Sequence, residues 1–489
     1  MTLYAILMWI ALLICLPMLL LMKKKLAAQR QNKQLHPPPT PPKLSIIGNL
    51  HQLGELRHQS HCRLFKNYGL VMLIKLGGIP NIVISSVENA REVVKVHDLN
   101  CCSRPSLDTT RRLAYNYQDI SFAPYGQYWR EMRKTCVLEV LSVKMMQSHR
   151  SIREEEKLFA LTANVTFIIV FGMILCGSYL DNERFQEVVH EATTMLGIFN
   201  ASEYVPYVGW IVDRLHVIDL HLKPDRTKPE HEDIIDVLLK IEREQTEADV
   251  VDFSKDHLRL YQYPNVVLGD VSGMRLDKNF VNNSKMNLFI GGVDTSAITM
   301  IWAMAELVRN PKVMKGAQDE VRKIVRNKGR VPEIDTDHLP YIKMILTETF
   351  RLHPPIPLLP RQPMVPFKLN GYDINPQSIM HVNAWAIGRD PQYWKNPKVF
   401  IPERFIDHSV DYKGQNFELL PFGASRRGCL GMYMGTSTIE LALVNLLYCF
   451  DWKLPPEMKD EDINMEESLD CNLTANKKTP LNLVPAKLF

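Results

Sequence analysis

The residues 421–431, PFGASRRGCLG, hold one cysteine between glycines and directly after two arginines. We expect a helix to begin near Leu430, which places Cys429 at its amino end, where unpaired N–H groups and the helix dipole favour an anion. Arg426 and Arg427 add positive charge, and both effects lower the pKa of a thiol. Three glycines let this backbone turn tightly against a flat, bulky group: Gly423, Gly428 and Gly431.

A thiolate held in this way is either a nucleophile or a metal ligand. The nine cysteines are scattered along the chain with no C-x-x-C pair, and only one is supplied here, which disfavours zinc with four protein ligands. A single thiolate on heme iron fits the pattern. The odd, scattered set also argues against a disulfide framework and fits a reducing compartment.

A second candidate site lies in residues 289–311, FIGGVDTSAITMIWAMAELVRNP. We predict a helix here, with Gly291, Asp294 and Thr295 on one face. The Thr295 hydroxyl can bond the Gly291 carbonyl and distort the helix locally. The result is a groove beside an acid and a hydroxyl, suited to a small ligand and to proton relay. Helix packing through small residues is the alternative interpretation.

Two further pairs carry little information alone. Glu348 and Arg351 stand at i, i+3, the favourable order for a helical ion pair, which at a surface contributes only about 0.2–0.5 kcal/mol. Trp129 and Arg133 share a helical face and could grip a planar ligand that bears a carboxylate. Taken in isolation, the second pair is better explained as part of an ordinary amphipathic face.

The elements that position these residues are mostly helical. Residues 71–86, VMLIKLGGIPNIVISS, predict a hairpin, and residues 87–310 have helical periodicity. Short strands are expected over 367–382 and a long helix over 432–450. No repeat or composition shift marks a boundary, so we predict one mainly α domain with small β-sheets over 43–489.

The composition excludes several classes of protein. The 489 residues are 46% hydrophobic and 23% charged, enough for a large core, and the net charge of +4 gives no reason to expect nucleic acid binding. HEDII, at 231–235, lacks the second histidine of a metalloprotease, and no glycine-rich phosphate loop precedes a helix.

The amino terminus predicts a membrane anchor. No charged side chain occurs from Thr2 to Met22, and three lysines follow at 23–25. Such a run is about 30 Å long as a helix, the thickness of a bilayer's hydrocarbon core. Charge after the apolar run indicates a signal anchor at 1–25 with a basic stop-transfer and a cytosolic body; a buried core helix is the alternative. Residues 26–42 predict a linker and a proline-rich strut, although a partner-binding motif is possible.

Together these motifs resemble those of the cytochrome P-450 monooxygenases. The set comprises Trp129…Arg133, Gly292-x-Asp294-Thr295, Glu348-x-x-Arg351, PERF at 402–405, and Phe422-Gly423…Arg427-x-Cys429-x-Gly431. PPKLSIIGNLHQLG, FAPYGQYWREMRK and AWAIGRDP are similar to plant family-71 members. The resemblance covers nearly the whole chain, and implies a cytochrome P-450 fold after a single transmembrane helix.

The resemblance implies roles for individual residues. Cys429 would be the axial thiolate of heme b iron, and Asp294 and Thr295 would deliver protons during oxygen activation. The heme propionates and ring would be held by Trp129, Arg133, Arg361, Arg427, Phe422, Gly423 and Gly431. A buried structural triad would consist of Glu348, Arg351 and Arg404.

The implied reaction inserts one oxygen atom from O2 into a small apolar substrate, for which a plant specialised metabolite is expected. Electrons would come from an NADPH–cytochrome reductase. The resemblance also implies a single-pass protein of the endoplasmic reticulum membrane whose catalytic domain faces the cytosol. A heme-thiolate rearrangement catalyst that does not use O2 is disfavoured because Asp294 and Thr295 are present.

The chain departs from the family pattern in five places. Ser425 stands where glycine is usual and Leu430 where proline is usual, and we expect heme binding to survive both. Segments are shortened after Lys157 and after Leu215, and residues 260–286 form an insert with no sustained apolar period. Our hypothesis is that these last three breaks reflect a mis-spliced transcript or a faulty gene model, and real divergence in variable loops is the alternative. The alternative to an active enzyme is therefore a catalytically inactive or mis-spliced, membrane-anchored family relic.

Overall fold

The computed structural model describes residues 35–150 and 278–487, apart from 108–109, 112–113, 115, 149, 326–330, 408–409 and 469–472. The predicted anchor at 1–25, the regions after Lys157 and Leu215, and the insert as far as residue 277 lie outside the described residues. Among the helices that are described, none is both long enough and apolar enough to cross a membrane.

Helices form far more of the described structure than strands do. They are α2 Arg57–Tyr68, α3 Val87–Arg91, α4 Asp98–Cys101, α6 Gln127–Thr135, α7 Val143–Ser148, α15 Lys278–Arg309, α16 Pro311–Val325, α17 Glu333–Thr336, α18 Pro340–Leu352, α19 Ala384–Ile387 and α20 Met432–Cys449. The strands are β1 Val71–Leu76, β2 Ile79–Ile84, β3 Leu358–Arg361, β4 Phe367–Leu369, β5 Tyr372–Ile374, β6 Ile379–Asn383, β7 Phe450–Lys453 and β8 Val484–Lys487. This is the mainly α fold with small sheets that the sequence predicts.

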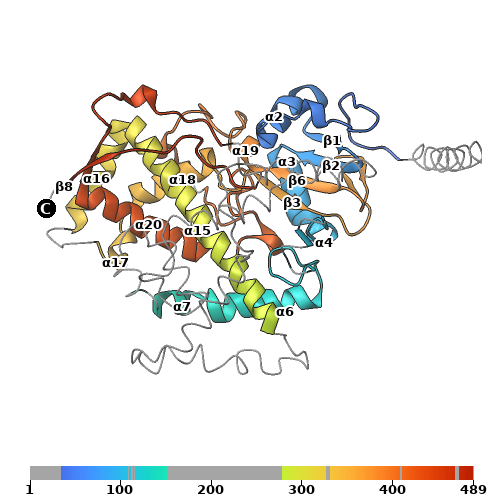
Figure 1. Cartoon of the computed structure of the whole chain (residues 1–489), viewed down its shortest axis with the longest axis horizontal. Coiled ribbons are helices and arrows are strands. Elements are labelled where there is room, and N and C mark those ends of the chain that lie inside the picture. Colours follow the sequence, from blue (N-terminus) through green and yellow to red (C-terminus); the bar gives the residue numbers. More distant parts are fainter. Residues whose placement is uncertain are drawn as a thin grey trace, which may run out of the picture.

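The largest sheet joins segments from both halves of the chain. Its order is β1-β2-β6-β3, with β2 and β6 parallel and the other pairs antiparallel. The predicted hairpin at 71–86 is confirmed as β1 and β2, and the predicted strands at 367–382 as β4, β5 and β6. This sheet lies beside α2, α3 and α4, whereas α16, α17 and α20 lie at the opposite end of the molecule (Figure 1).

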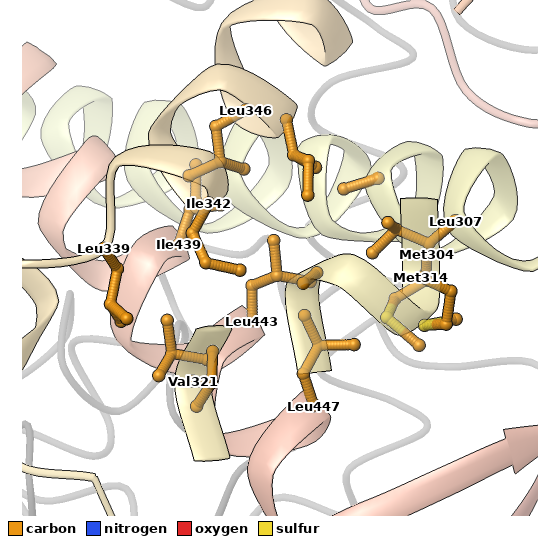
Figure 2. Close-up of a cluster of buried hydrophobic side chains, with 14 of the residues drawn as sticks. Met304, Leu307, Met314, Val321, Leu339, Ile342, Leu346, Ile439, Leu443 and Leu447 are labelled. Carbon is orange, nitrogen blue, oxygen red and sulfur yellow. The ribbon is translucent and has the colours of Figure 1, made fainter. Parts of the chain in front are cut away.

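The largest apolar core lies among α15, α16, α18 and α20. Met304 and Leu307 of α15 lie in this cluster with Ile342 of α18 and Leu443 of α20, and all are buried (Figure 2). Helix α16 contributes Met314, Ala317, Val321 and Val325, a spacing of three and four that places them on one helical face. This core holds α15, the helix that carries Gly291 and Thr295, against α20, the helix that follows the cysteine loop.

Helix α15 is longer than the sequence indicates. We expected residues 260–286 to interrupt the helix that leads into Gly291, but α15 runs from Lys278 to Arg309. That expectation is therefore wrong for residues 278–286. The physical reason is that the poor helix formers of the insert, Pro264, Gly269 and Gly273, all precede residue 278.

The proline segment is docked on the body of the protein. The Leu73 N–H of β1 donates to the Pro39 carbonyl at 2.8 Å, and the Asp373 N–H of β5 donates to the His36 carbonyl at 2.7 Å. The Asn49 amide donates to the carbonyls of Pro41 and Pro42. Residues 36–42 are therefore fixed to two sheets along their length.

Two histidines make the fold sensitive to acid. His61 of α2 lies 6.4 Å from His381 of β6, ring centre to ring centre, and among the described residues neither nitrogen of His61 nor His381 Nδ1 has a hydrogen-bond partner. Burial lowers the pKa of His381 to about 4, and Arg57 contributes; burial, with His381 second, lowers the pKa of His61 further.

A histidine whose folded pKa is lowered binds more protons when unfolded, so stability is lost as pH falls from about 6.5 to about 4. We expect roughly 3 kcal/mol of this loss to come from His381. Urea unfolding midpoints measured between pH 7.5 and 4.5 should show it, and His381→Gln should flatten the dependence. An unchanged slope in that variant would contradict the assignment.

Candidate functional site

The cysteine loop is a tight turn that connects a short 3₁₀ helix, Ser425–Arg427, to α20. The Cys429 N–H donates to the Phe422 carbonyl at 2.8 Å, and Gly423 has φ +65°, a conformation that favours glycine. Helix α20 begins at Met432 rather than near Leu430. Cys429 therefore precedes the first helical turn, and its side chain is exposed at the surface of the loop.

The protein around the loop raises the pKa of the Cys429 thiol. Because protein surrounds the loop at longer range, loss of water raises the pKa of Cys429 above its ordinary value. The Gly431 N–H and the Arg133 guanidinium act in the opposite direction and are outweighed. The sequence-based expectation of a lowered pKa is wrong because it did not include this desolvation. A metal ion deprotonates a coordinating thiol directly, so the raised pKa does not conflict with a ligand role.

Helix α6 brings an aromatic ring and a cation to the loop. The Arg133 Nη2 donates to the Gly428 carbonyl at 2.8 Å, which ties α6 to the cysteine loop. Trp129 is buried, and its Nε1–H donates to the Ile120 carbonyl at 3.0 Å. The Arg427 guanidinium lies 4.1 Å from the centre of the Trp129 ring, so the ring and the two arginines form one cluster.

Arg427 has unused hydrogen-bonding capacity. It is only 8% exposed; its Nε donates to the Cys102 carbonyl and its Nη2 to the Ala123 carbonyl, both at 2.6 Å. Its Nη1 is buried and has no partner among the described residues. Burial lowers the pKa of Arg427 to about 9, and the positive charge of Arg104 contributes. A buried guanidinium with a lowered pKa and one nitrogen left unpaired by the described residues would be stabilised by a neighbouring anion.

Arg104 belongs to the same cluster and was missed by the sequence analysis. Its Nε donates to the Ser121 carbonyl at 3.3 Å and its Nη1 to the Pro360 carbonyl. Burial lowers the pKa of Arg104 to about 10, and Arg361 and Arg133 contribute repulsion. Arg104 is the one charged side chain in residues 99–107, which was the available signal.

Arg361 is engaged with a carboxylate. Its Nη1 lies 2.8 Å from Asp98 Oδ1, and its Nη2 donates to the Ala424 carbonyl at 2.9 Å. The second oxygen of Asp98 bonds Arg426 at 2.7 Å. Arg361 therefore positions the start of the cysteine loop relative to α4 and β3.

The predicted helical face on α15 is present. The Thr295 Oγ1 donates to the Gly291 carbonyl at 2.5 Å, as predicted. Apart from its own helix and chain neighbours, no heavy atom of the described residues lies within 4 Å of a Cβ built on Gly291. Asp294 is half-buried one residue before Thr295. Gly291 thus leaves room for a flat group to approach the helix backbone.

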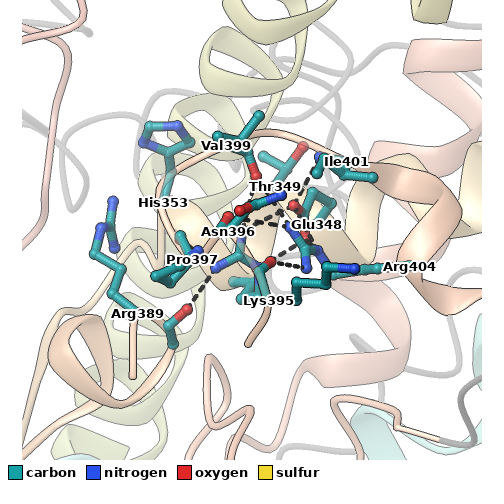
Figure 3. Close-up of polar contacts among 12 residues, drawn as sticks. Glu348, Thr349, His353, Arg389, Lys395, Asn396, Pro397, Val399, Ile401 and Arg404 are labelled. Carbon is teal, nitrogen blue, oxygen red and sulfur yellow. Dashed lines mark hydrogen bonds and ion pairs between the residues drawn. The ribbon is translucent and has the colours of Figure 1, made fainter. Parts of the chain in front are cut away.

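Glu348 and Arg404 lie together in the interior (Figure 3), and Arg351 is paired with the same carboxylate. The Arg351 Nε lies 2.7 Å from Glu348 Oε2, and the Arg404 Nε lies 3.0 Å from Glu348 Oε1. Arg351 also donates to the carbonyls of Gly388 and Pro397 at 2.6 and 2.7 Å. The pair read as an ordinary helical ion pair is therefore the centre of a buried network that fixes the loop at 395–401.

Phe422 connects the loop to α18. Its ring centre lies 5.0 Å from that of Phe350 and 5.6 Å from that of Tyr412. Phe350 follows Glu348 by two residues and is buried. The cysteine loop and the buried network therefore share one helix as support.

Ser425 has φ +59°, and its hydroxyl donates to the Val94 carbonyl. The positive φ costs a non-glycine residue about 1–2 kcal/mol, and the hydrogen bond returns about 1 kcal/mol. We expect Ser425→Ala to lower stability by about 1 kcal/mol, because alanine keeps the strain and loses the bond. Ser425→Gly should change the stability by less, because glycine removes the backbone strain as well as the hydrogen bond. Urea unfolding of the two variants checks this, and a less stable glycine variant would contradict it.

The described residues fit a heme. A heme has two carboxylates, a flat macrocycle and an iron that accepts an axial thiolate. The buried arginines, with Arg427 Nη1 unpaired among the described residues, match the carboxylates. Within the part of the chain that the structure describes, Gly431, like Gly291, has no heavy atom within 4 Å of an added Cβ beyond its own chain neighbours, which suits a flat ring. Cys429 is the exposed cysteine among those described.

Comparison with known proteins agrees with this geometry. The family model described as Cytochrome P450 matches residues 38–157 and 144–481. The chain is 48% identical over 480 residues to Cytochrome P450 71B10 of Arabidopsis thaliana, covering 92% of this chain and 93% of the relative. It is 46% identical over 475 residues to Cytochrome P450 71B34 of the same plant, with the same coverage. The chain therefore belongs to the cytochrome P450 family, resembles its family 71, and uses heme iron as its cofactor.

Proposed function

We propose that this protein inserts one oxygen atom from O2 into a small apolar organic molecule, a plant specialised metabolite, using electrons from an NADPH reductase. The family supports a monooxygenase. The observation that carries the proposal is the cluster of arginines beside the cysteine loop, in which Arg427 is buried and the half-buried Arg133 donates to the Gly428 carbonyl. Such a cluster needs anionic groups to offset its charge.

The proposed roles follow from these positions. Cys429 would supply the thiolate ligand of the iron, and a heme held there would supply the activation of O2, which a thiolate ligand favours. Arg133 and Arg427 would hold the propionates together with Arg104. Trp129, whose N–H donates to Ile120, and Arg361, which is paired with Asp98, would support this cluster from behind. Phe422, Gly423 and Gly431 would shape the loop against the ring. Glu348, Arg351 and Arg404 keep the loop's support rigid.

Asp294 and Thr295 are proposed to move protons to the site of oxygen activation. We expect Thr295→Ala to lower the share of electrons that reach product by at least about tenfold, because a positioned proton donor is lost. Thr295→Ser keeps the hydroxyl and should retain most of that share. NADPH oxidation, O2 uptake and hydrogen peroxide release, measured together, check this; unchanged peroxide release in the alanine variant would contradict it.

The proposed setting is the endoplasmic reticulum membrane, with an anchor at 1–25 and the catalytic domain on the cytosolic side. The supporting observation is the apolar run followed by lysines in the sequence. The proposed reductase is membrane-bound and docks on the cysteine side.

Oxygen consumption tests the proposal as a whole. The full-length protein, combined with a plant NADPH–cytochrome reductase in lipid vesicles, should consume O2 in an NADPH-dependent manner. Failure to do so while the heme is bound would mean a family member that has lost its activity, as expected for the inactive-relic alternative. The uninterrupted helix α15 over residues 278–309 favours the active form.

A further inference from the structure

A buried carboxylate lies inside the turn that precedes α6. Asp119 is fully buried. Its Oδ1 accepts the Phe122 N–H at 2.6 Å, and its Oδ2 accepts the Nδ2–H of Asn287 at 3.1 Å. The second bond connects residues 168 positions apart and joins this turn to α15.

The carbonyls of the same turn accept hydrogen bonds from three side chains of the proposed heme site, Trp129, Arg104 and Arg427, which we call the cradle. The Ile120 carbonyl accepts from Trp129 Nε1 at 3.0 Å, the Ser121 carbonyl from Arg104 Nε at 3.3 Å, and the Ala123 carbonyl from Arg427 Nη2 at 2.6 Å. The backbone of residues 119–123 therefore sets the positions of an aromatic ring and two guanidinium groups. Asp119, through Phe122, helps to fix that backbone.

Asn287, the side-chain partner of Asp119, lies on α15, the helix that carries Gly291 and Thr295. Asn287 stands four residues before Gly291, and so on the same face of α15. Thr295 follows by a further four residues and bonds the Gly291 carbonyl. One hydrogen bond thus connects the turn that holds the cradle with the helical face that carries Gly291 and Thr295.

The ionised carboxylate costs stability at neutral pH. Burial raises the pKa of Asp119 to about 6, against the opposing bonds from Phe122, Asn287 and the N–H groups of Ser121 and Ala123. Arg104 supplies a nearby positive charge. A carboxyl group whose folded pKa is raised binds more protons when folded, so stability falls as pH rises from about 4 to about 6. Stability alone therefore does not explain an acid at this position.

We propose that Asp119 is a positioning residue that, through Asn287, fixes the Gly291–Thr295 face of α15 relative to the arginine–tryptophan cradle. The inference rests on the proposed heme site and extends it to a residue that does not touch the cofactor. The Asp119–Asn287 bond fixes the distance and angle between the two halves of the site.

Exchange of the two residues tests the link. Asn287→Asp replaces the amide donor with a second carboxyl group within hydrogen-bonding distance of Asp119. Burial already raises the pKa of Asp119 to about 6, and a like charge this close raises the pKa of one partner further, so the pair shares a proton near neutral pH and repels only at alkaline pH, where both groups are ionised. At alkaline pH we expect the full-length, heme-loaded variant to show a red-shifted, carbon-monoxide-bound Soret band reduced roughly tenfold relative to total heme, which corresponds to one pKa unit of lost interaction. At pH 6 the shared proton restores a hydrogen bond and the band should recover.

The double variant Asp119→Asn/Asn287→Asp restores one donor and one acceptor with the direction reversed. We expect the intensity of its band to lie within about twofold of that of the unmodified protein, because the effects of two substitutions at contacting residues are not additive. Asn310→Asp is the matched control, because it makes the same change directly after α15 and beside another carboxylate, Glu306, whose Oε2 lies 3.4 Å from the Asn310 amide. That variant should keep the band.

Three results would overturn the proposal: an unaffected Asn287→Asp protein, a double variant no better than the single one, or an equal loss in Asn310→Asp. Circular dichroism of each variant separates global unfolding from a local effect. If the unmodified protein itself lacks the red-shifted band, the proposed heme-thiolate function fails and the inference fails with it. If the band is present and the exchange has no effect, only the inference fails.

Discussion

Replacement of Cys429 by alanine is expected to abolish the red-shifted Soret band of the reduced, carbon-monoxide-bound protein. That band requires a thiolate on the iron, and alanine provides no ligand atom. The loop itself should remain in place. Its hydrogen bonds from the Cys429 N–H to Phe422 and from Arg133 to Gly428 are made to backbone atoms and survive the change.

A cysteine elsewhere on the neighbouring helix is the appropriate control. Cys449 lies at the last position of α20, 18 residues long, far from the loop along the helix. Cys449→Ala should keep the full band. Difference spectra of the unmodified protein and the two variants, recorded at equal concentration, test this prediction. A band that persists in Cys429→Ala would exclude Cys429 as the iron ligand.

Replacement of Glu348 by glutamine is expected to destabilise the protein by about 3–5 kcal/mol, because it leaves buried guanidinium groups without their counter-charge. Glu348 is fully buried, and its oxygens contact Arg351, Arg404 and the Ile401 N–H. Most single domains have only about 5–15 kcal/mol of stability to lose. The variant should therefore accumulate poorly as soluble protein and unfold at a much lower urea concentration.

The same substitution at Glu403 is the control. Its Oε1 accepts a bond from the exposed Tyr341 hydroxyl at 2.5 Å, so Glu403→Gln removes a charge at the surface. Such a change contributes within about 1 kcal/mol. Equal unfolding midpoints for the two variants would show that the Glu348 network is not a main source of stability.

The sequence predicted the elements that depend on local pattern. The hairpin at 71–86, the strands near 367–382 and the helix after Gly431 all follow from periodicity and turn residues, and all are present. The Thr295–Gly291 bond also followed from spacing alone, because both residues lie on one helix four positions apart.

What the sequence did not predict depends on contacts between distant segments. Strand β3, the pairing of β2 with β6 and the place of Arg104 in the site require the folded arrangement of both halves of the chain. The raised pKa of Cys429 likewise comes from surrounding protein rather than from the adjacent arginines and helix end. The Asp119–Asn287 bond spans segments whose proximity no local pattern indicates.

The parallel pairing of β2 with β6 has a consequence for synthesis of the protein. Met380 pairs with Ile82, so a ribosome must add roughly 300 further residues before β2 receives its neighbour, a delay of roughly 15–60 s at ordinary translation rates. During that time the hairpin exposes one strand edge with apolar residues, the kind of edge on which chains aggregate. Nascent chains that stop before Ile379 should therefore depend on chaperones more than the finished protein does.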